Sequence, residues 1–231
     1  MIIKKLIYVR KSQFSKWLLS RIFKKRVGTA MQTMLQTLSA NHMLPKNLIA
    51  LELFGFIGTN ATMDYAHLAD YIEMWEIDPF FAKEAQKYIP KARVICGDSI
   101  KAISNGGLLR KDYNFIVIDP NVFMHNYVSF ESFGIFGHAL KYVAKDTVIF
   151  VNIFNNVEEY IKKYGANERI EDWIKARKEF FAIDNVVSAR GIDYLKGFEK
   201  IIKAEKLDIV YSNFISRNEY VGFGVFVLKK C

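Results

Sequence analysis

Four short apolar segments between Leu48 and Asp119 constrain the fold of this chain more than any other feature. Each is rich in Ile, Val, Leu or Phe and ends at an acidic residue or a tight turn, and helix-length segments separate them. They are LIALELFGFIGT from Leu48, YIEMWEIDP from Tyr71, ARVICGDS from Ala92 and YNFIVIDPN from Tyr113. Strands of a parallel sheet have this pattern because helices cover them on both faces. The pattern therefore predicts a βαβ array and an α/β fold.

Two further apolar segments, LDIVYSNFIS and YVGFGVFVLKK, flank Arg217-Asn218-Glu219 and predict a β-hairpin. A fifth strand is expected from Thr147 to Phe154. We therefore expect a seven-stranded, mostly parallel sheet that has helices on both faces and an antiparallel strand contributed by the hairpin. The 231 residues, 51% of them hydrophobic, suffice for one domain with attachments.

The domain division follows from helical patterns outside the strands. Residues 1–47 are expected to form a basic helical extension, with Met31, Met34, Leu35 and Leu38 on the buried face of its second helix. Residues 48–231 form the main domain. Residues 155–190 carry more helical pattern than an α/β connection needs, so we expect a helical insertion that covers the substrate, packs on the domain or forms a dimer contact.

The net charge of +9 is concentrated in the amino-terminal part, which has ten Lys or Arg and no Asp or Glu before Glu52. Such asymmetry predicts contact with nucleic acid or an anionic membrane surface through residues 1–26. Phe14, Trp17, Leu18 and Ile22 recur there at helical spacing, which also suits packing on the main domain, an interfacial helix or an organellar transit peptide.

The two cysteines, Cys96 and Cys231, form neither a disulfide framework nor a metal site with ligand spacing, so no metal is expected. Their number suits a reducing cytoplasm. The sequence has no uninterrupted apolar run long enough to span a membrane and no secretory signal pattern. We expect a cytoplasmic protein, with a peripheral membrane location left open by the basic segment.

Carboxylates end the predicted strands: Glu52, Glu76, Asp98 and Asp119. The carboxyl ends of parallel strands meet at one edge of the sheet, which is where an open α/β sheet binds its ligand. Glu76 follows Glu52 by 24 positions, close to the spacing of about 20 at which an acid meets a ribose hydroxyl. Glu76 also suits a cap or a solvated charge, and Asp98 suits the N-cap of a following helix.

Four motifs, ELFGFIG, EIDP, CGD and IDPN, occur in this order and resemble those of the class I S-adenosylmethionine-dependent methyltransferases over Leu48 to Leu228. The resemblance implies a Rossmann-like fold and S-adenosylmethionine as the cofactor. It places Glu76 on the ribose, Ile77 against the adenine and Asp98 on the adenine amino group. The cofactor-binding residues that it implies are Glu52, Phe54, Gly55, Gly58, Glu76, Ile77, Asp98 and Ser99.

The first loop departs from the family pattern at Phe56, which stands where the family has its middle glycine. That glycine lets the backbone turn tightly and approach the ligand. Gly55 is a candidate to supply this freedom instead, and Thr59 or Asn60 to cap the helix that follows.

On the acceptor side, the resemblance places Asp119 and Asn121 next to the transferred methyl group. Methyl transfer from a sulfonium mainly needs the nucleophile to be aligned and, where required, deprotonated. The acceptor is left open, with RNA or another molecule associated with a polyanion among the options. Two alternatives remain: an aminopropyltransferase, and a non-catalytic binding module that acts through the basic amino terminus.

Overall fold

The computed structural model describes residues 28–59, 61–120, 133–165 and 168–230. Its strands form one sheet of seven, in the order β3-β2-β1-β4-β5-β7-β6. The strands are β1 (Leu48–Leu53), β2 (Ala69–Glu76), β3 (Ala92–Cys96), β4 (Tyr113–Ile118), β5 (Val143–Phe154), β6 (Leu207–Ser216) and β7 (Val221–Lys230). β1 to β5 pair in parallel, whereas β7 is antiparallel to both β5 and β6. The predicted α/β class, the mostly parallel sheet and the antiparallel hairpin strand are confirmed.

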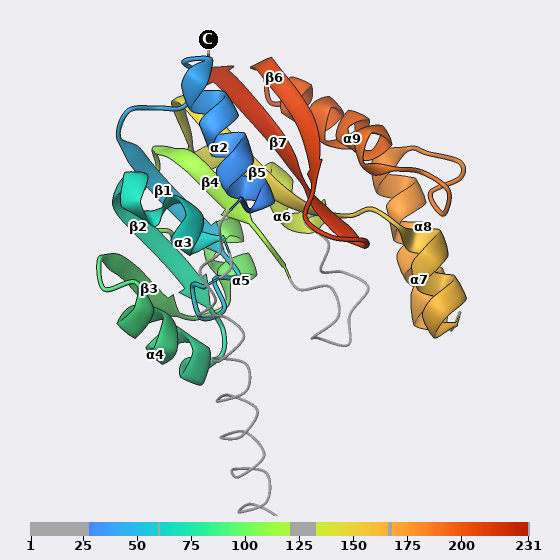
Figure 1. The fold of residues 1–231 in the computed structure, drawn as a ribbon, viewed down its shortest axis with the longest axis horizontal. Coiled ribbons are helices and arrows are strands. Elements are labelled where there is room, and N and C mark those ends of the chain that lie inside the picture. Colours follow the sequence, from blue (N-terminus) through green and yellow to red (C-terminus); the bar gives the residue numbers. More distant parts are fainter. Residues whose placement is uncertain (1–27, 60, 121–132, 166–167, 231) are drawn as a thin grey trace, which may run out of the picture.

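Helices cover both faces of this sheet (Figure 1). The elements are α2 (Ala30–Ala40), α3 (Thr62–Tyr65), η1 (Ala66–Leu68), α4 (Pro79–Tyr88), α5 (Ser99–Ser104), α6 (Phe133–Ala139), η3 (Leu140–Tyr142), α7 (Val157–Tyr164), α8 (Glu168–Phe181) and α9 (Gly191–Ala204). Residues of α2 and α3 share one buried cluster with the sheet, and those of α5, α6 and α9 share the other. Among the described helices, none is both long and apolar enough to cross a membrane.

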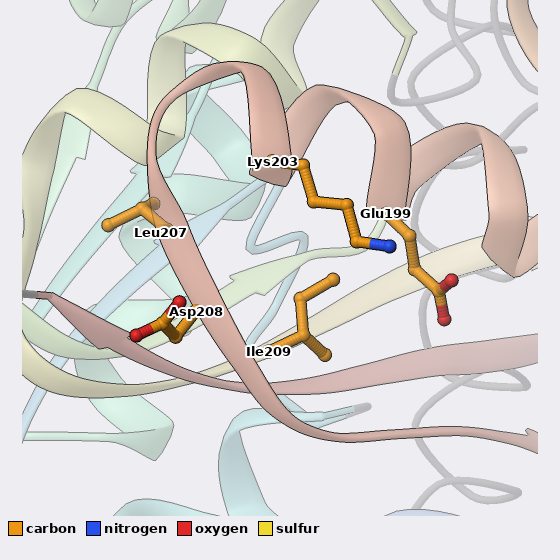
Figure 2. Close-up of a pocket in the computed structure, with 5 residues that line it drawn as sticks. All are labelled: Glu199, Lys203, Leu207, Asp208 and Ile209. Carbon is orange, nitrogen blue, oxygen red and sulfur yellow. The ribbon is translucent and has the colours of Figure 1, made fainter.

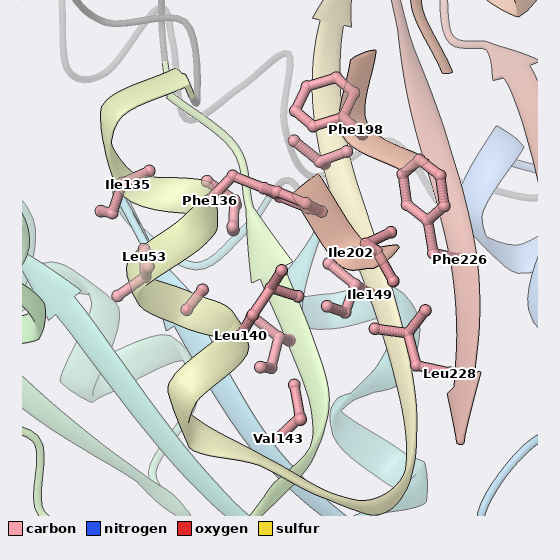
Figure 3. Close-up of a cluster of buried hydrophobic side chains, with 14 of the residues drawn as sticks. Leu53, Ile135, Phe136, Leu140, Val143, Ile149, Phe198, Ile202, Phe226 and Leu228 are labelled. Carbon is pink, nitrogen blue, oxygen red and sulfur yellow. The ribbon is translucent and has the colours of Figure 1, made fainter. Parts of the chain in front are cut away.

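The larger cluster lies between the sheet and the helices α6 and α9 (Figure 3). It is closed by aromatic contacts, among them the edge-on pair of Phe136 and Phe198 at 4.7 Å between ring centroids. Burial of this apolar surface is the main force that holds the helices to the strands.

The helix α2 begins with a capping box in which Thr29 and Gln32 bond to each other's backbone N–H groups. The same two side chains donate hydrogen bonds to Asp64 of α3, at 2.7 Å and 2.9 Å. Met31, Met34, Leu35 and Leu38 are buried, as their spacing predicts. The start of α2 is thereby fixed to α3, which packs over the end of β1. The proposed boundary at residue 47 stays a prediction.

Candidate functional site

The carboxyl ends of β1 to β4 meet at one edge of the sheet, because these strands are parallel neighbours. The structure brings Glu76, Asp98 and Asp119 to this edge, together with the loop that follows β1. The sequence placed these residues there through strand ends alone. The edge is the candidate site.

The loop after β1 turns through three residues with positive φ: Phe54 at 67°, Phe56 at 50° and Gly58 at 75°. A left-handed conformation costs a non-glycine residue roughly 1–2 kcal/mol, so two phenylalanines in this state mark a constrained loop. Phe56 thus adopts the region that glycine enters most easily. Its ring packs against Phe81 of α4, with 4.4 Å between centroids.

Gly55 lies close to β2 in this loop, and a Cβ there would come within 2.3 Å of Met74 Cγ. Its N–H donates to the carbonyl of Trp75 at 2.9 Å, and its carbonyl accepts from the Gly58 N–H at 2.9 Å. The loop is therefore pinned to β2. The helix α3 that follows has Ala61 as its N-cap residue, so Thr59 does not hold the predicted N-cap position. Asn60, the other predicted candidate, lies outside the described residues.

The carboxylate of Glu76 joins this loop to the loop that follows β2. Its Oε2 accepts from the Phe56 N–H and its Oε1 from the Asp78 N–H, each at 2.8 Å. The residue is 8% exposed. Glu76 holds the two loops in position at the centre of the edge.

Beside Glu76, Ile77 leaves an apolar side chain 56% exposed. Asp98 follows β3, the strand that pairs with β2. It caps α5 by accepting hydrogen bonds from the N–H groups of Ile100 and Lys101, at 3.0 Å and 3.2 Å. Asp98 keeps a third of its side chain exposed, at 33%. Ser99, the first residue of α5, is buried. The cap predicted for Asp98 is confirmed, and its role toward a ligand stays a prediction.

Glu52 lies deeper than the other acids, at 2% exposure beneath α3. Its Oε2 accepts hydrogen bonds from the hydroxyls of Thr62 and Tyr65, each at 2.6 Å. Burial raises the pKa of the Glu52 carboxyl to about 8, although both hydroxyls and Arg217 act in the opposite direction. Asp119 adds to the upward shift.

Asp119 follows β4 and is ion-paired with Arg217, a partner that sequence reasoning missed. Arg217 Nη1 donates to Oδ1 at 2.7 Å and to Oδ2 at 2.9 Å. A topological signal for this pair was available, because β6 runs parallel to β5 and so brings the hairpin turn to the same edge as the end of β4. Asn121, the other predicted acceptor-side residue, lies outside the described residues, as do residues 1–26.

These residues fit the adenosine half of the cofactor that the resemblance implies. Adenosine needs a hydrogen-bond acceptor for its ribose, an apolar face for its base and an acceptor for the adenine amino group. Groups of these kinds follow one another along the ends of β2 and β3: the buried carboxylate of Glu76, the exposed side chain of Ile77 and the partly exposed carboxylate of Asp98. Within the described parts of the chain, no group of His, Cys, Asp and Glu is placed to hold a metal ion.

A separate open hollow of about 520 Å³ lies between α9 and the start of β6 (Figure 2). It is lined by Glu199, Lys203, Leu207, Asp208 and Ile209. Because β6 is parallel to β5, its first residues lie at the amino edge of the parallel strands, opposite to the candidate site. We therefore do not assign the hollow to the site.

The strand order, the antiparallel β7 and the acidic carboxyl edge together define the fold of the class I S-adenosylmethionine-dependent methyltransferases. Solved structures agree. A TehB-like S-adenosylmethionine-dependent methyltransferase from Corynebacterium glutamicum has a TM-score of 0.55 at 13% identity, covering 96% of this chain and 99% of that chain. A methyltransferase from Clostridium acetobutylicum has a TM-score of 0.55 at 13% identity, covering 96% and 98%.

The magnesium protoporphyrin IX methyltransferase from Synechocystis, solved with bound S-adenosylhomocysteine, has a TM-score of 0.54 at 14% identity, with 98% of this chain and all of that chain covered. No protein-family model matches the chain, and no curated protein matches its sequence. At this level of identity the likeness establishes the fold. The family resemblance read from the motifs is confirmed at that level.

Proposed function

We propose that this protein is an S-adenosylmethionine-dependent methyltransferase. The observation that carries the proposal is Glu76, an acid held by two loop N–H groups at the end of β2, between an exposed Ile77 and a partly exposed Asp98. The match in fold to methyltransferases supports it. When bound, S-adenosylmethionine supplies an electrophilic methyl group on its sulfonium.

In this proposal, different residues along the carboxyl edge of the sheet bind different parts of the cofactor and the acceptor. Glu76 accepts from the ribose hydroxyls, Ile77 packs on the adenine, and Asp98 accepts from the adenine amino group. Phe54, Gly55 and Gly58 shape the loop beneath the cofactor. Asp119 faces the acceptor, where alignment of the nucleophile provides most of the rate enhancement for an in-line transfer.

Calorimetry with S-adenosylhomocysteine tests this proposal. We expect micromolar binding by the natural chain and at least tenfold weaker binding by Glu76→Gln, because the amide keeps one acceptor oxygen and places a donor where the other acted, a loss of about 1.4 kcal/mol or more. The matched control is Asp112→Asn, whose carboxylate pairs with Arg110 on the surface. A thermal melt of each variant verifies that it is folded.

Three other results would redirect the proposal. Equal affinity of Glu76→Gln and the natural chain would remove Glu76 from the site. If the natural chain binds neither S-adenosylmethionine nor S-adenosylhomocysteine, the result would favour a non-catalytic binding module. Preference for decarboxylated S-adenosylmethionine would favour an aminopropyltransferase.

A further inference from the structure

Three contacts hold Arg217 beside Asp119 at the carboxyl edge of the sheet, two of them to its guanidinium and one to its backbone. Its Nη1 donates to both oxygens of Asp119 at 2.7 Å and 2.9 Å, and its Cζ lies 4.4 Å from the ring centroid of the buried Phe223. Its backbone N–H donates to the Val221 carbonyl at 2.9 Å, which fixes the hairpin turn. The cation is therefore preorganised, and little entropy remains to be lost when it binds a partner.

One edge of this guanidinium is not used by the described residues. Arginine has five N–H donors, and both contacts to Asp119 come from Nη1. Within the described part of the chain, Nε and Nη2 of Arg217 donate to no acceptor. The side chain is 23% exposed, so part of it meets solvent. The two parallel N–H groups of this edge match the two oxygens of a carboxylate.

We propose that the Nε and Nη2 edge of Arg217 binds a carboxylate of the methyl acceptor, which is a small molecule. The assignment of the carboxylate to the methyl acceptor rests on the proposed methyltransferase function. The carboxylate-binding site itself does not. A small carboxylate is favoured over an RNA backbone because, among the described residues, the proposed site draws on one guanidinium, that of Arg217, which is already paired with Asp119. Binding to a phosphate backbone relies on several Lys and Arg. Asp119 would then lie beside the bound acid's nucleophile.

The test uses sodium acetate as the probe, at constant ionic strength, with the full chain. Resonances of the Arg217 Nε–H and of the Asn218 backbone amide are followed by NMR. We expect saturable shifts in the millimolar range. Arg217→Gln should abolish the shift at Asn218, and Arg217→Lys should weaken binding about tenfold because a lysine lacks the planar fork.

Asp119→Asn should bind acetate more tightly than the natural chain, because the neighbouring negative charge is removed. The control is Arg110→Gln, which removes a guanidinium that pairs with Asp112 on the surface and should leave the acetate shift at Asn218 unchanged.

Absence of a saturable shift in the natural chain, or its persistence in Arg217→Gln, would overturn the inference. Tighter binding of inorganic phosphate or of a trinucleotide RNA than of acetate would overturn the carboxylate assignment. Titration of the same samples with S-adenosylhomocysteine separates the two proposals. Binding of S-adenosylhomocysteine without binding of acetate would contradict only the carboxylate site at Arg217. Binding of acetate without binding of S-adenosylhomocysteine would contradict only the proposed methyltransferase function.

Discussion

Glu52 is an acid that the fold keeps away from water. Burial beneath α3 raises the pKa of its carboxyl from the ordinary value of 4.5 to about 8, and the hydroxyls of Thr62 and Tyr65 offset part of that shift. Between these two pH values the folded chain binds a proton at Glu52 that the unfolded chain has released. The stability gained is therefore fully present below the unfolded pKa and is lost as the pH rises to about 8.

Glu52→Gln should remove this pH dependence, because the amide is neutral throughout and its oxygen can accept from both hydroxyls. Relative to the natural chain, the variant's free energy of unfolding should rise by up to about 1.4 kcal/mol per pH unit inside the window. Urea unfolding measured across the window tests this. Glu179→Gln, on an exposed part of α8, is the control. Parallel pH profiles of Glu52→Gln and the natural chain would contradict the pKa.

For a single acidic residue, the sequence predicts its position along a strand but not the side chains that surround it. It put Glu52, Glu76 and Asp98 at strand ends, where they are found. It did not reveal Thr62 and Tyr65 as partners of Glu52, because the packing of α3 over β1 depends on tertiary contacts that no local pattern encodes.

The loop after β1 acts as one element because its glycines and phenylalanines are held against β2 and α4. Gly55 is the tightest point, with Met74 Cγ at 2.3 Å and Sδ at 2.6 Å from a Cβ built there. Any side chain at this position must displace the buried side chain of Met74 in β2. The loop thus tolerates Phe56, whose ring turns toward Phe81, but not a side chain at Gly55.

Gly55→Ala is therefore expected to destabilise the chain by about 1–3 kcal/mol through overpacking, and to weaken S-adenosylhomocysteine binding as the loop shifts. Urea unfolding and calorimetry measure the two effects. Gly134→Ala in α6 is the matched control, since no atom lies within 4 Å of the added methyl group. Unchanged stability of Gly55→Ala would show that Met74 moves freely.

Most helices and strands could be predicted from the spacing of hydrophobic residues alone. The strands from Leu48 to Ile118 and the hairpin around Arg217 are examples. The loop conformation could not be predicted in this way. Backbone propensity alone predicts that a phenylalanine in place of the family's glycine cannot make the tight turn. In the structure Phe56 does adopt the left-handed backbone conformation, and its ring contacts Phe81. Tertiary packing decided that local conformation.

At the scale of the whole molecule, Arg177 joins three parts of the fold. It lies on α8, is fully buried, and donates from Nη2 to the carbonyl of Phe154 at the end of β5, at 2.7 Å. Its Cζ lies 4.3 Å from the ring centroid of Tyr194 in α9 and 5.0 Å from that of Trp173. Figure 1 shows α8 at the side of the sheet where β7 begins. Arg177 therefore ties this helical segment to the sheet.

Arg177→Met should lower the free energy of unfolding by about 3 kcal/mol, because the hydrogen bond to Phe154 and the contacts with the aromatic faces are lost. Urea unfolding provides the value. Lys178→Met, the exposed neighbour on α8, should change it little. Equal effects of the two substitutions would mean that the buried guanidinium contributes nothing.

The strand β7 lies between β5 and β6, although it follows both in the sequence. During synthesis on the ribosome, β6 thus has no neighbour in the sheet until residues 221–230 have emerged. Asp119 and Arg217, which are 98 positions apart, meet only after that insertion. A nascent chain would therefore complete the ends of β1 to β3 early and the Asp119–Arg217 pair late, so a product that stalls before residue 221 should lack this ion pair.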